Sequence, residues 1–291
     1  MGKASRRKKD ATPKAARGAT YSARPFAGLP GESDWVALSE ILPAATTTVP
    51  LKAGVAPDGG PSEVTIATVL PMAWPALRRG DGSILVATQG GSSSGDASRD
   101  LGAAILAALA AEPGQPVARV ESATDATPPL QELLELTEAP VVTVHEGFDF
   151  WVEGQDLQGE AAESMQRANE TVVPTTKMSG AESAYWCLLG DRPHIRLILP
   201  DDEDSATNAV ARLWAAGASG LGEGTRMLGA FRARGLIIPV WELPRGTEAA
   251  DYDQALTEFM SRYAAARTDA ELTGEERRAR AGLVNRQVTL R

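Results

Sequence analysis

The sequence predicts an α+β fold of two tandem, internally duplicated β-β-α-α-β units, with mostly antiparallel sheets and helices on one face. Two observations support this prediction. Segments 74–89 and 185–200 both contain an apolar run, a Gly-Asp turn and a second apolar run, and they lie 111 residues apart. Each segment is then followed by a polar loop and an alanine-rich amphipathic stretch. Chance similarity of the two strings is the alternative explanation.

In the first unit, segment 74–89 is typical of a β-hairpin, because two apolar runs flank a glycine-containing turn. A helix is expected over 101–111. This apolar run is much shorter than the roughly 20 residues of a membrane-spanning helix, so it predicts a core helix. A second helix is expected over 130–138, and the apolar run 141–146 predicts a strand.

The second unit repeats this order of elements. Its expected elements are a hairpin at 185–200, helices at 209–216 and 226–234, and a strand at 237–242. A last helix is expected over 251–267, where apolar side chains recur at helical spacing and form one stripe. Two copies of one unit commonly pair about a pseudo-twofold axis, so we hypothesise a groove between them.

Four regions follow from these patterns. They are a basic disordered tail at 1–25, a first α+β repeat at 26–147, a second repeat with a C-terminal helix at 148–267, and an arginine-rich tail at 268–291. Segment 11–25 is rich in Ala, Pro, Gly and Ser, and it buries too little apolar surface to order itself. The C-terminal tail has little apolar content, so we expect it to be mobile or ordered by a partner.

Charge is distributed unevenly along the chain. The first 24 residues carry eight Lys or Arg and one Asp, a net charge of +7, whereas the whole chain carries −9, so the remainder carries −16. A basic arm on an acidic body predicts a polyanionic partner for the arm, which would neutralise phosphates without reading sequence. A solubilising terminus without a partner is the alternative. The candidate nucleic-acid-binding residues are Lys3, Arg6, Arg7, Lys8, Lys9, Lys14 and Arg17.

Cysteine content and hydropathy indicate a cytoplasmic protein without a membrane segment. The single cysteine, Cys187, excludes an intramolecular disulfide, and its apolar neighbours predict burial in a strand. The basic start is not followed by the apolar stretch of an export signal. The six tryptophans lie within apolar runs, so core packing is favoured over base stacking.

Three features offer site chemistry, each with a simpler explanation. The GGSSSG segment 90–95, between an expected strand and helix, permits phosphate binding but lacks the lysine-containing spacing of a nucleotide loop. The acidic run 201–204 has the oxygen ligands that Mg²⁺ prefers, but acids before a helix favour capping. His145 and His194 have no Cys or Asp at metal-ligand spacing. The sequence therefore assigns no catalytic residue, cofactor or metal, and it favours binding over enzymatic activity.

Three stretches carry a family resemblance: MGKASRRKK at 1–9, RPFAGLPGESDWVAL at 24–38 with LPAA at 42–45, and ERRARAGLVNRQ at 276–287. They resemble an uncharacterised actinobacterial family whose function is unknown, and the resemblance spans nearly the whole chain. It implies no activity, cofactor or catalytic residue. Members sometimes carry a topoisomerase II label, which this chain does not support, because it is short and lacks a nucleotide-binding glycine motif.

The expected function is that of a non-enzymatic cytoplasmic binding or adaptor protein. Its basic tail would contact nucleic acid or the ribosome, and its acidic body would bind a protein partner. One alternative is an enzyme that acts on a phosphorylated substrate in a groove between the repeats, using Asp201, Asp202 and segment 90–95. Another is a chaperone-like adaptor whose acidic body receives basic client segments.

Overall fold

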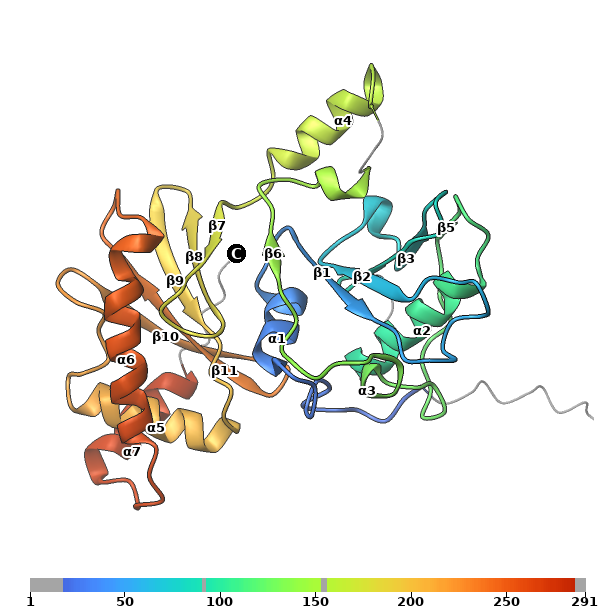
Figure 1. The fold of residues 1–291 in the computed structure, drawn as a ribbon. Helices are drawn as coiled ribbons and strands as arrows, with labels where there is room; N and C mark the ends of the chain where they lie inside the picture. The colour runs from blue at the N-terminus through green and yellow to red at the C-terminus, as the bar shows by residue number, and fades with distance from the viewer. Residues whose placement is uncertain (1–17, 91–92, 153–155, 286–291) are drawn as a thin grey trace, which may run out of the picture.

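The protein contains two β-sheets that lie side by side, with helix α1 (Glu32–Glu40) between them (Figure 1). The computed structural model describes residues 18–90, 93–152 and 156–285. One sheet has six strands in the order β5-β3-β4-β2-β1-β6, and the other has five in the order β10-β11-β9-β8-β7. The pairs are antiparallel except β2 with β4. A mixed α+β fold with mostly antiparallel sheets is therefore confirmed.

The six-stranded sheet belongs to the first half of the chain. Its strands are β1 (Ala45–Pro50), β2 (Glu63–Ala67), β3 (Ala76–Arg78), β4 (Ile84–Ala87), β5 (Pro116–Val117) and β6 (Thr143–Val144). The associated helices are η1 (Pro71–Ala73), α2 (Ala97–Ala110), α3 (Leu130–Leu133), η2 (Asp149–Trp151) and α4 (Glu160–Asn169). The apolar side of α2 packs with α1 against one face of the sheet, which leaves the opposite face to η2 and α4.

The five-stranded sheet belongs to the second half. Its strands are β7 (Thr175–Lys177), β8 (Ala184–Leu189), β9 (Arg192–Leu197), β10 (Arg226–Ala233) and β11 (Leu236–Glu242). The helices of this half are α5 (Glu203–Ala215), η3 (Ala249–Tyr252), α6 (Asp253–Ala266) and α7 (Gly274–Asn285). Helices α5 and α6 pack on one face, where Trp241 and Phe259 are fully buried.

Helix α1 joins the two halves into one packed body. Trp35 and Leu38 on this helix are fully buried in a core that also contains Tyr185 and Leu236 of the second sheet. The N-cap of the helix is Gly31, whose φ of 66° is left-handed, and a Cβ there would lie 2.7 Å from the Ala139 Cβ. Only glycine combines that backbone conformation with so close an approach.

A buried polar cluster crosses the same interface. The Asp34 carboxylate on α1 accepts hydrogen bonds from Lys177 Nζ at 3.1 Å and from the Tyr185 hydroxyl at 3.1 Å. Only 3% of the Asp34 side chain is exposed. Burial, followed by the nearby Asp34 charge, raises the pKa of the Tyr185 hydroxyl, which therefore remains a hydrogen-bond donor. The cluster satisfies a buried carboxylate with groups from the opposite half.

Several sequence predictions are confirmed. The two expected hairpins are β3 with β4 and β8 with β9. The expected helices 101–111 and 209–216 lie within or next to α2 and α5, and 251–267 corresponds to η3 and α6. Cys187 lies in β8 and is 2% exposed, as expected, and burial raises the pKa of its thiol. Trp35, Trp186 and Trp241 are core residues.

Other expectations are corrected. Segment 226–234 is not a helix but strand β10, because it pairs with β11 along its length. The helix expected over 130–138 is the single turn α3, after which Leu134 bridges to Leu51. Part of the expected C-terminal tail is helix α7, which packs on α5 and buries Leu283. Residues 18–25 are also ordered by contacts, since Ala19 is buried and its N–H donates to the Ala123 carbonyl.

The internal duplication is not confirmed. Both halves contain a hairpin followed by a helix, but the strands beside the two hairpins differ. Besides its hairpin partner, β4 pairs with β2, which is parallel to it and precedes it in the chain. Strand β9 pairs instead with β11, which is antiparallel to it and follows it in the chain. The two halves therefore share a local order of elements and differ in how their sheets are connected.

Candidate functional site

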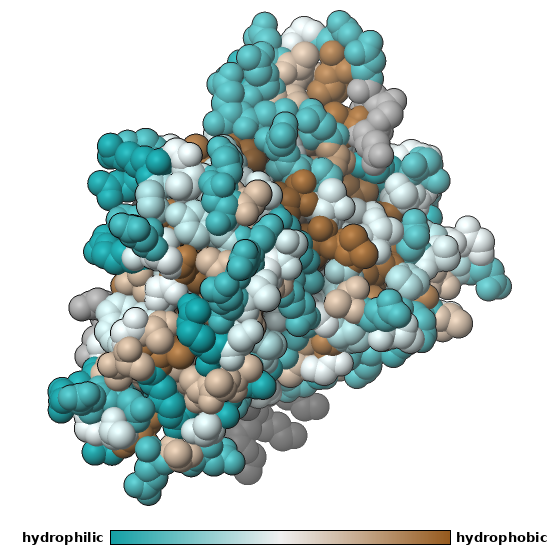
Figure 2. Space-filling model, turned by 60° about the vertical axis from the view of Figure 1, so that its left-hand side comes forward, coloured by the Kyte–Doolittle hydropathy of each residue, from teal (hydrophilic) through white to brown (hydrophobic). Residues whose placement is uncertain are grey.

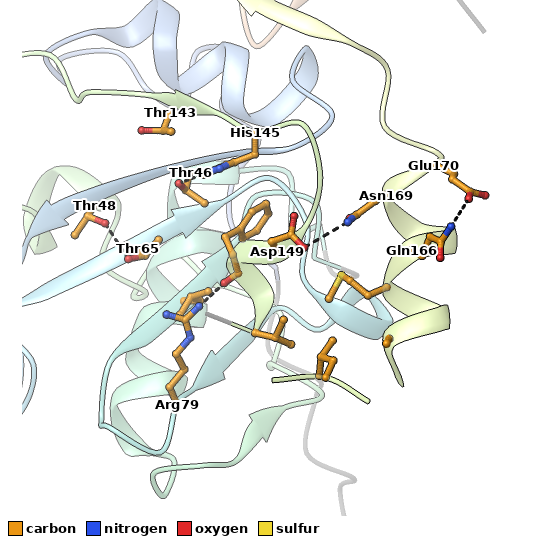
Figure 3. Close-up of a pocket in the computed structure, with 16 residues that line it drawn as sticks. Thr46, Thr48, Thr65, Arg79, Thr143, His145, Asp149, Gln166, Asn169 and Glu170 are labelled. Atoms are coloured by element: carbon orange, nitrogen blue, oxygen red, sulfur yellow. Dashed lines mark hydrogen bonds between the residues drawn. The ribbon is translucent and has the colours of Figure 1, made fainter. Parts of the chain in front are cut away.

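A groove lies between the outer face of the six-stranded sheet and the segment that carries η2 and α4 (Figure 3). The cavity has a volume of about 1080 Å³, which suits a short peptide or another ligand of comparable size. Helix α4 projects from the body, and none of its residues is buried (Figure 1). The groove therefore has a rigid sheet as its floor and an exposed helical segment as its roof.

The floor is a patch of threonine hydroxyls. Thr46 and Thr48 lie two residues apart on β1, so both side chains point to the same face of the sheet. Thr65 on β2 pairs with Thr48, and their hydroxyl oxygens are 3.0 Å apart. Thr143 on β6 pairs with Thr46. These side chains supply hydrogen-bond donors and acceptors without charge.

Asn169 connects the end of α4 to the loop before η2. Its Oδ1 accepts the Phe148 N–H at 2.7 Å, and its Nδ2 donates to Asp149 Oδ1 at 3.4 Å. Gly147 lies directly against this amide, since a Cβ there would be 2.6 Å from the Asn169 Cγ. The side chain of Asn169 therefore sets the distance between α4 and the rest of the roof.

An aromatic cluster lies beside the groove, and of its members Phe150 lines the groove itself. Phe148 stacks on Trp151 with ring centroids 4.4 Å apart, and the indole N–H of Trp151 donates to the Val69 carbonyl at 2.9 Å. The Phe150 ring lies 4.9 Å from the His145 ring. Figure 2 shows apolar surface gathered at the foot of the protruding, largely hydrophilic α4. A ligand in the groove would thus meet the Phe150 and His145 rings beside the hydroxyl floor.

The roof is strongly acidic. In the sequence, segment 145–170 contains seven Asp or Glu residues and one arginine, a net charge of −6, and one of these acids, Glu153, lies outside the described residues. Two of these acids, Asp149 and Glu170, line the groove itself. The groove also contains Arg79, which donates to the Phe150 carbonyl, and His145, whose Nε2 is 2.8 Å from the Thr46 hydroxyl. Asp149 and Glu170 together outweigh the single charge of Arg79, so the groove and its acidic roof favour a cationic ligand.

The roof and floor of the groove come from residues that sequence analysis did not single out, apart from His145. The threonines lie on strands that are distant in sequence, and only the sheet register brings them together. The excess of acids in 145–170 was visible in the sequence. It is the signal that could have indicated this site.

The residues proposed from sequence to bind nucleic acid lie outside the described part of the chain. They are Lys3, Arg6, Arg7, Lys8, Lys9, Lys14 and Arg17. Arg24, which the sequence analysis counted with this arm, belongs instead to the folded body. Its guanidinium pairs with Glu32 at 2.7 Å and donates to the Pro200 carbonyl at 2.9 Å.

The acids considered for an enzyme site are engaged in contacts within the fold, and Asp202 caps a helix. The Asp202 carboxylate accepts the Ser205 N–H at the start of α5, and Asp201 accepts the Tyr263 hydroxyl at 2.6 Å and pairs with Arg267. At the start of α2, Asp96 accepts the N–H groups of Ser98 and Arg99. Asp202 and Asp96 therefore occupy N-terminal donors that a phosphate bound at either helix would need.

A second cavity, of about 460 Å³, borders both halves of the molecule. It is lined in part by Gly90 and Ser93 of the predicted phosphate loop, whereas Gly91 and Ser92 lie outside the described residues. Its rim contains the ion pair of Glu40 with Arg234, at 2.7 Å, and the acid Asp100. The acidic lining disfavours a phosphorylated ligand.

The two histidines lie in different environments. His194 is 5% exposed, its Nδ1 lies 2.9 Å from the Arg192 carbonyl, and burial lowers its pKa. His145 lies in the groove. Across residues 18–90, 93–152 and 156–285, no group of three or more His, Cys, Asp or Glu is placed to hold a metal ion. Within the same ranges, none of the helices is both long and apolar enough to cross a membrane.

Comparison with protein families shows which family the chain belongs to. A model described as a family of unknown function (DUF5926) matches residues 25–291. The chain belongs to this family. The DUF5926 match covers both sheets and the groove, and it confirms the resemblance to an uncharacterised family. Searches of the curated proteins and of the solved structures gave no match.

The position of α4 can be tested through Asn169. We expect Asn169→Ala to speed amide hydrogen exchange throughout α4 and to lower the free energy of unfolding by only about 1 kcal/mol, because it removes the hydrogen bond to Phe148 N–H. Gln166→Ala is the matched control, since the Gln166 side chain donates to Glu170, four residues further on, at 3.3 Å and not to the loop before η2. Equal exchange in both variants would contradict this role for Asn169.

Proposed function

We propose that this protein is a non-enzymatic cytoplasmic adaptor. Its groove holds a basic, extended polypeptide segment of a partner protein, and its N-terminal arm contacts nucleic acid or the ribosome. The observation that supports the proposal is the acidic roof, with a net charge of −6 over residues 145–170, above a floor of threonine hydroxyls. Opposite charges on two parts of one chain suit an adaptor that binds two unlike partners.

The groove suits a polypeptide because its donors and acceptors are spread along a floor. The hydroxyls of Thr46, Thr48 and Thr65 lie on adjacent strands, so an extended backbone crossing them would meet several polar groups in turn. Lys or Arg side chains of that segment would face Asp149 and Glu170 across the groove. The Phe150 ring beside Asp149 offers a face for a cation–π contact.

Binding rather than catalysis is supported by the contacts of the polar groups. His145 is hydrogen-bonded to Thr46, Asp149 accepts from Asn169, and Glu170 accepts from Gln166. The two carboxylates therefore accept from side-chain amides rather than from another acid or base. A general acid–base pair usually shows a direct contact between its two members, or one through water.

Charge-neutral substitutions test the groove. We expect the double variant Asp149→Asn, Glu170→Gln to bind a fluorescein-labelled, lysine- and arginine-rich dodecapeptide about tenfold more weakly than wild type at low salt, which corresponds to about 1.4 kcal/mol. The measurement is fluorescence anisotropy at 50 and 300 mM salt. The difference should shrink at the higher salt, because exposed charges are screened.

The control removes the same charge elsewhere. Glu223→Gln, Asp269→Asn alters two exposed acids of the second half that do not line the groove, and its affinity should match wild type. An equal loss in both variants would show that net charge alone attracts the peptide. The groove would then not be the binding site.

A further inference from the structure

We infer that the basic N-terminal segment 1–17 of the same chain occupies the groove when no partner is bound. The inference rests on the proposed function, since it names a regulator of the same site. It makes the arm a competitor for the groove, so that capture of the arm by nucleic acid opens the site to a basic partner segment.

Charge complementarity is the first argument. Segment 1–17 carries seven Lys or Arg residues and one Asp, a net charge of +6, and segment 145–170 carries −6. Asp149 and Glu170 line the groove, and their carboxylates accept from the side-chain amides of Asn169 and Gln166, respectively. Their remaining lone pairs are available to a guanidinium or ammonium group.

The reach of the arm is the second argument. Gly18 is fixed at the surface, because Ala19 N–H donates to the Ala123 carbonyl and Thr20 bonds to Asp125. An extended chain of 17 residues spans up to about 60 Å. A compact body of this size has a radius of gyration of about 18 Å and is therefore about 50 Å across. The extended arm is therefore slightly longer than the body is wide.

Tethering makes weak contacts sufficient. A segment linked to the body by a short flexible chain has an effective concentration in the millimolar range. Exposed ion pairs of modest individual strength would then fill the groove for a substantial part of the time. A polyanion that binds the arm withdraws it from the groove. By linkage, a partner segment that displaces the arm raises the affinity of the arm for the polyanion by the same factor.

The arm is tested in the full-length chain. The arm variant carries Arg6→Gln, Arg7→Gln, Lys8→Gln and Lys9→Gln, which remove four charges outside the described body. We expect it to bind the labelled basic dodecapeptide twofold to tenfold more tightly than wild type, because the internal competitor is weakened. The control is Arg277→Gln, Arg278→Gln on α7, which removes two positive charges at the other end of the chain and should leave the affinity unchanged.

Zero-length crosslinking gives a second readout. Carbodiimide treatment of the wild-type chain should join Lys3, Lys8 or Lys9 to the acids of segment 145–170, with the products identified by mass spectrometry. A mixture of ¹⁵N-labelled and unlabelled chains distinguishes crosslinks within one chain from crosslinks between two copies. We expect the crosslinks to form within one chain. Crosslinks only between copies, or none to this segment, would overturn the inference.

The outcomes also separate the inference from the proposed function. Suppose the groove variant loses peptide binding while the arm variant binds as wild type does. The adaptor proposal then stands and the internal competitor is rejected. If neither wild type nor the arm variant binds the peptide, both proposals are rejected.

Discussion

Replacing Asp34 with alanine is expected to lower the free energy of unfolding by about 3 kcal/mol, because it removes the acceptor of a buried polar cluster. The Tyr185 hydroxyl would lose its partner inside the core, and the Lys177 ammonium would keep only solvent at its partly exposed tip. Urea unfolding followed by circular dichroism measures the change. The loss should appear as a shift of one cooperative transition, since both halves contribute to the cluster.

The control for this variant is an ion pair of the same type at the surface. Asp191 pairs with Arg245 at 2.9 Å, and both side chains are about two-thirds exposed. Asp191→Ala should change the free energy of unfolding by less than about 0.5 kcal/mol. Similar losses for Asp34 and Asp191 would show that burial adds nothing to the cluster and would contradict the expectation.

Trp35→Ala is expected to cost about 3 to 5 kcal/mol, which is typical of deleting a buried indole. The ring is fully buried, packs 6.2 Å from the Phe26 ring, and donates its N–H to the Pro30 carbonyl at 3.2 Å. Because α1 lies between the sheets, the cavity would open at the centre of the molecule rather than within one half.

Trp35→Phe provides the graded comparison, since it keeps an aromatic ring and loses only part of the volume and the hydrogen bond. Its cost should be clearly smaller than that of alanine. Tyr21→Ala, at a residue 76% exposed, should be nearly neutral. An alanine variant at position 35 that unfolds at the wild-type urea concentration would show that α1 is not part of the shared core.

The local elements of the fold followed from sequence where a turn and two apolar runs coincide. The hairpins of β3 with β4 and of β8 with β9 were predicted for this reason. Strand β10 was missed because Met, Leu, Ala and Arg favour helices, whereas pairing with β11 decides the outcome. The missed signal was Arg234-Gly235, a turn with both φ angles positive between two apolar runs.

The arrangement of the two halves did not follow from sequence. No local sequence pattern predicts the burial of α1 or the contact of Asp34 with Lys177, because both depend on residues more than 140 positions away. The apparent repeat also led to a hypothesis of equivalent units. Strand order is set by long-range pairing, which similar local strings do not determine.

The candidate site could be predicted only in part from the sequence, for the same reason. The charge division between arm and body followed from counting residues, and it still motivates the adaptor proposal. The floor of the groove required the register of β1 with β2 and β6, which places four threonines on one face. The sequence indicated what kind of partner to expect, and the structure indicates where on the body to look for it.

The roof of the groove is also the covalent link between the two sheets, because the chain leaves β6 and reaches β7 only through α4. Arg167, with 64% of its side chain exposed, is the single trypsin site between β6 and β7. One cut there would leave fragments 1–167 and 168–291 held together by the core around α1. The two fragments are thus suited to a complementation experiment. A ligand bound in the groove would be detected because it protects the peptide bond after Arg167 from trypsin.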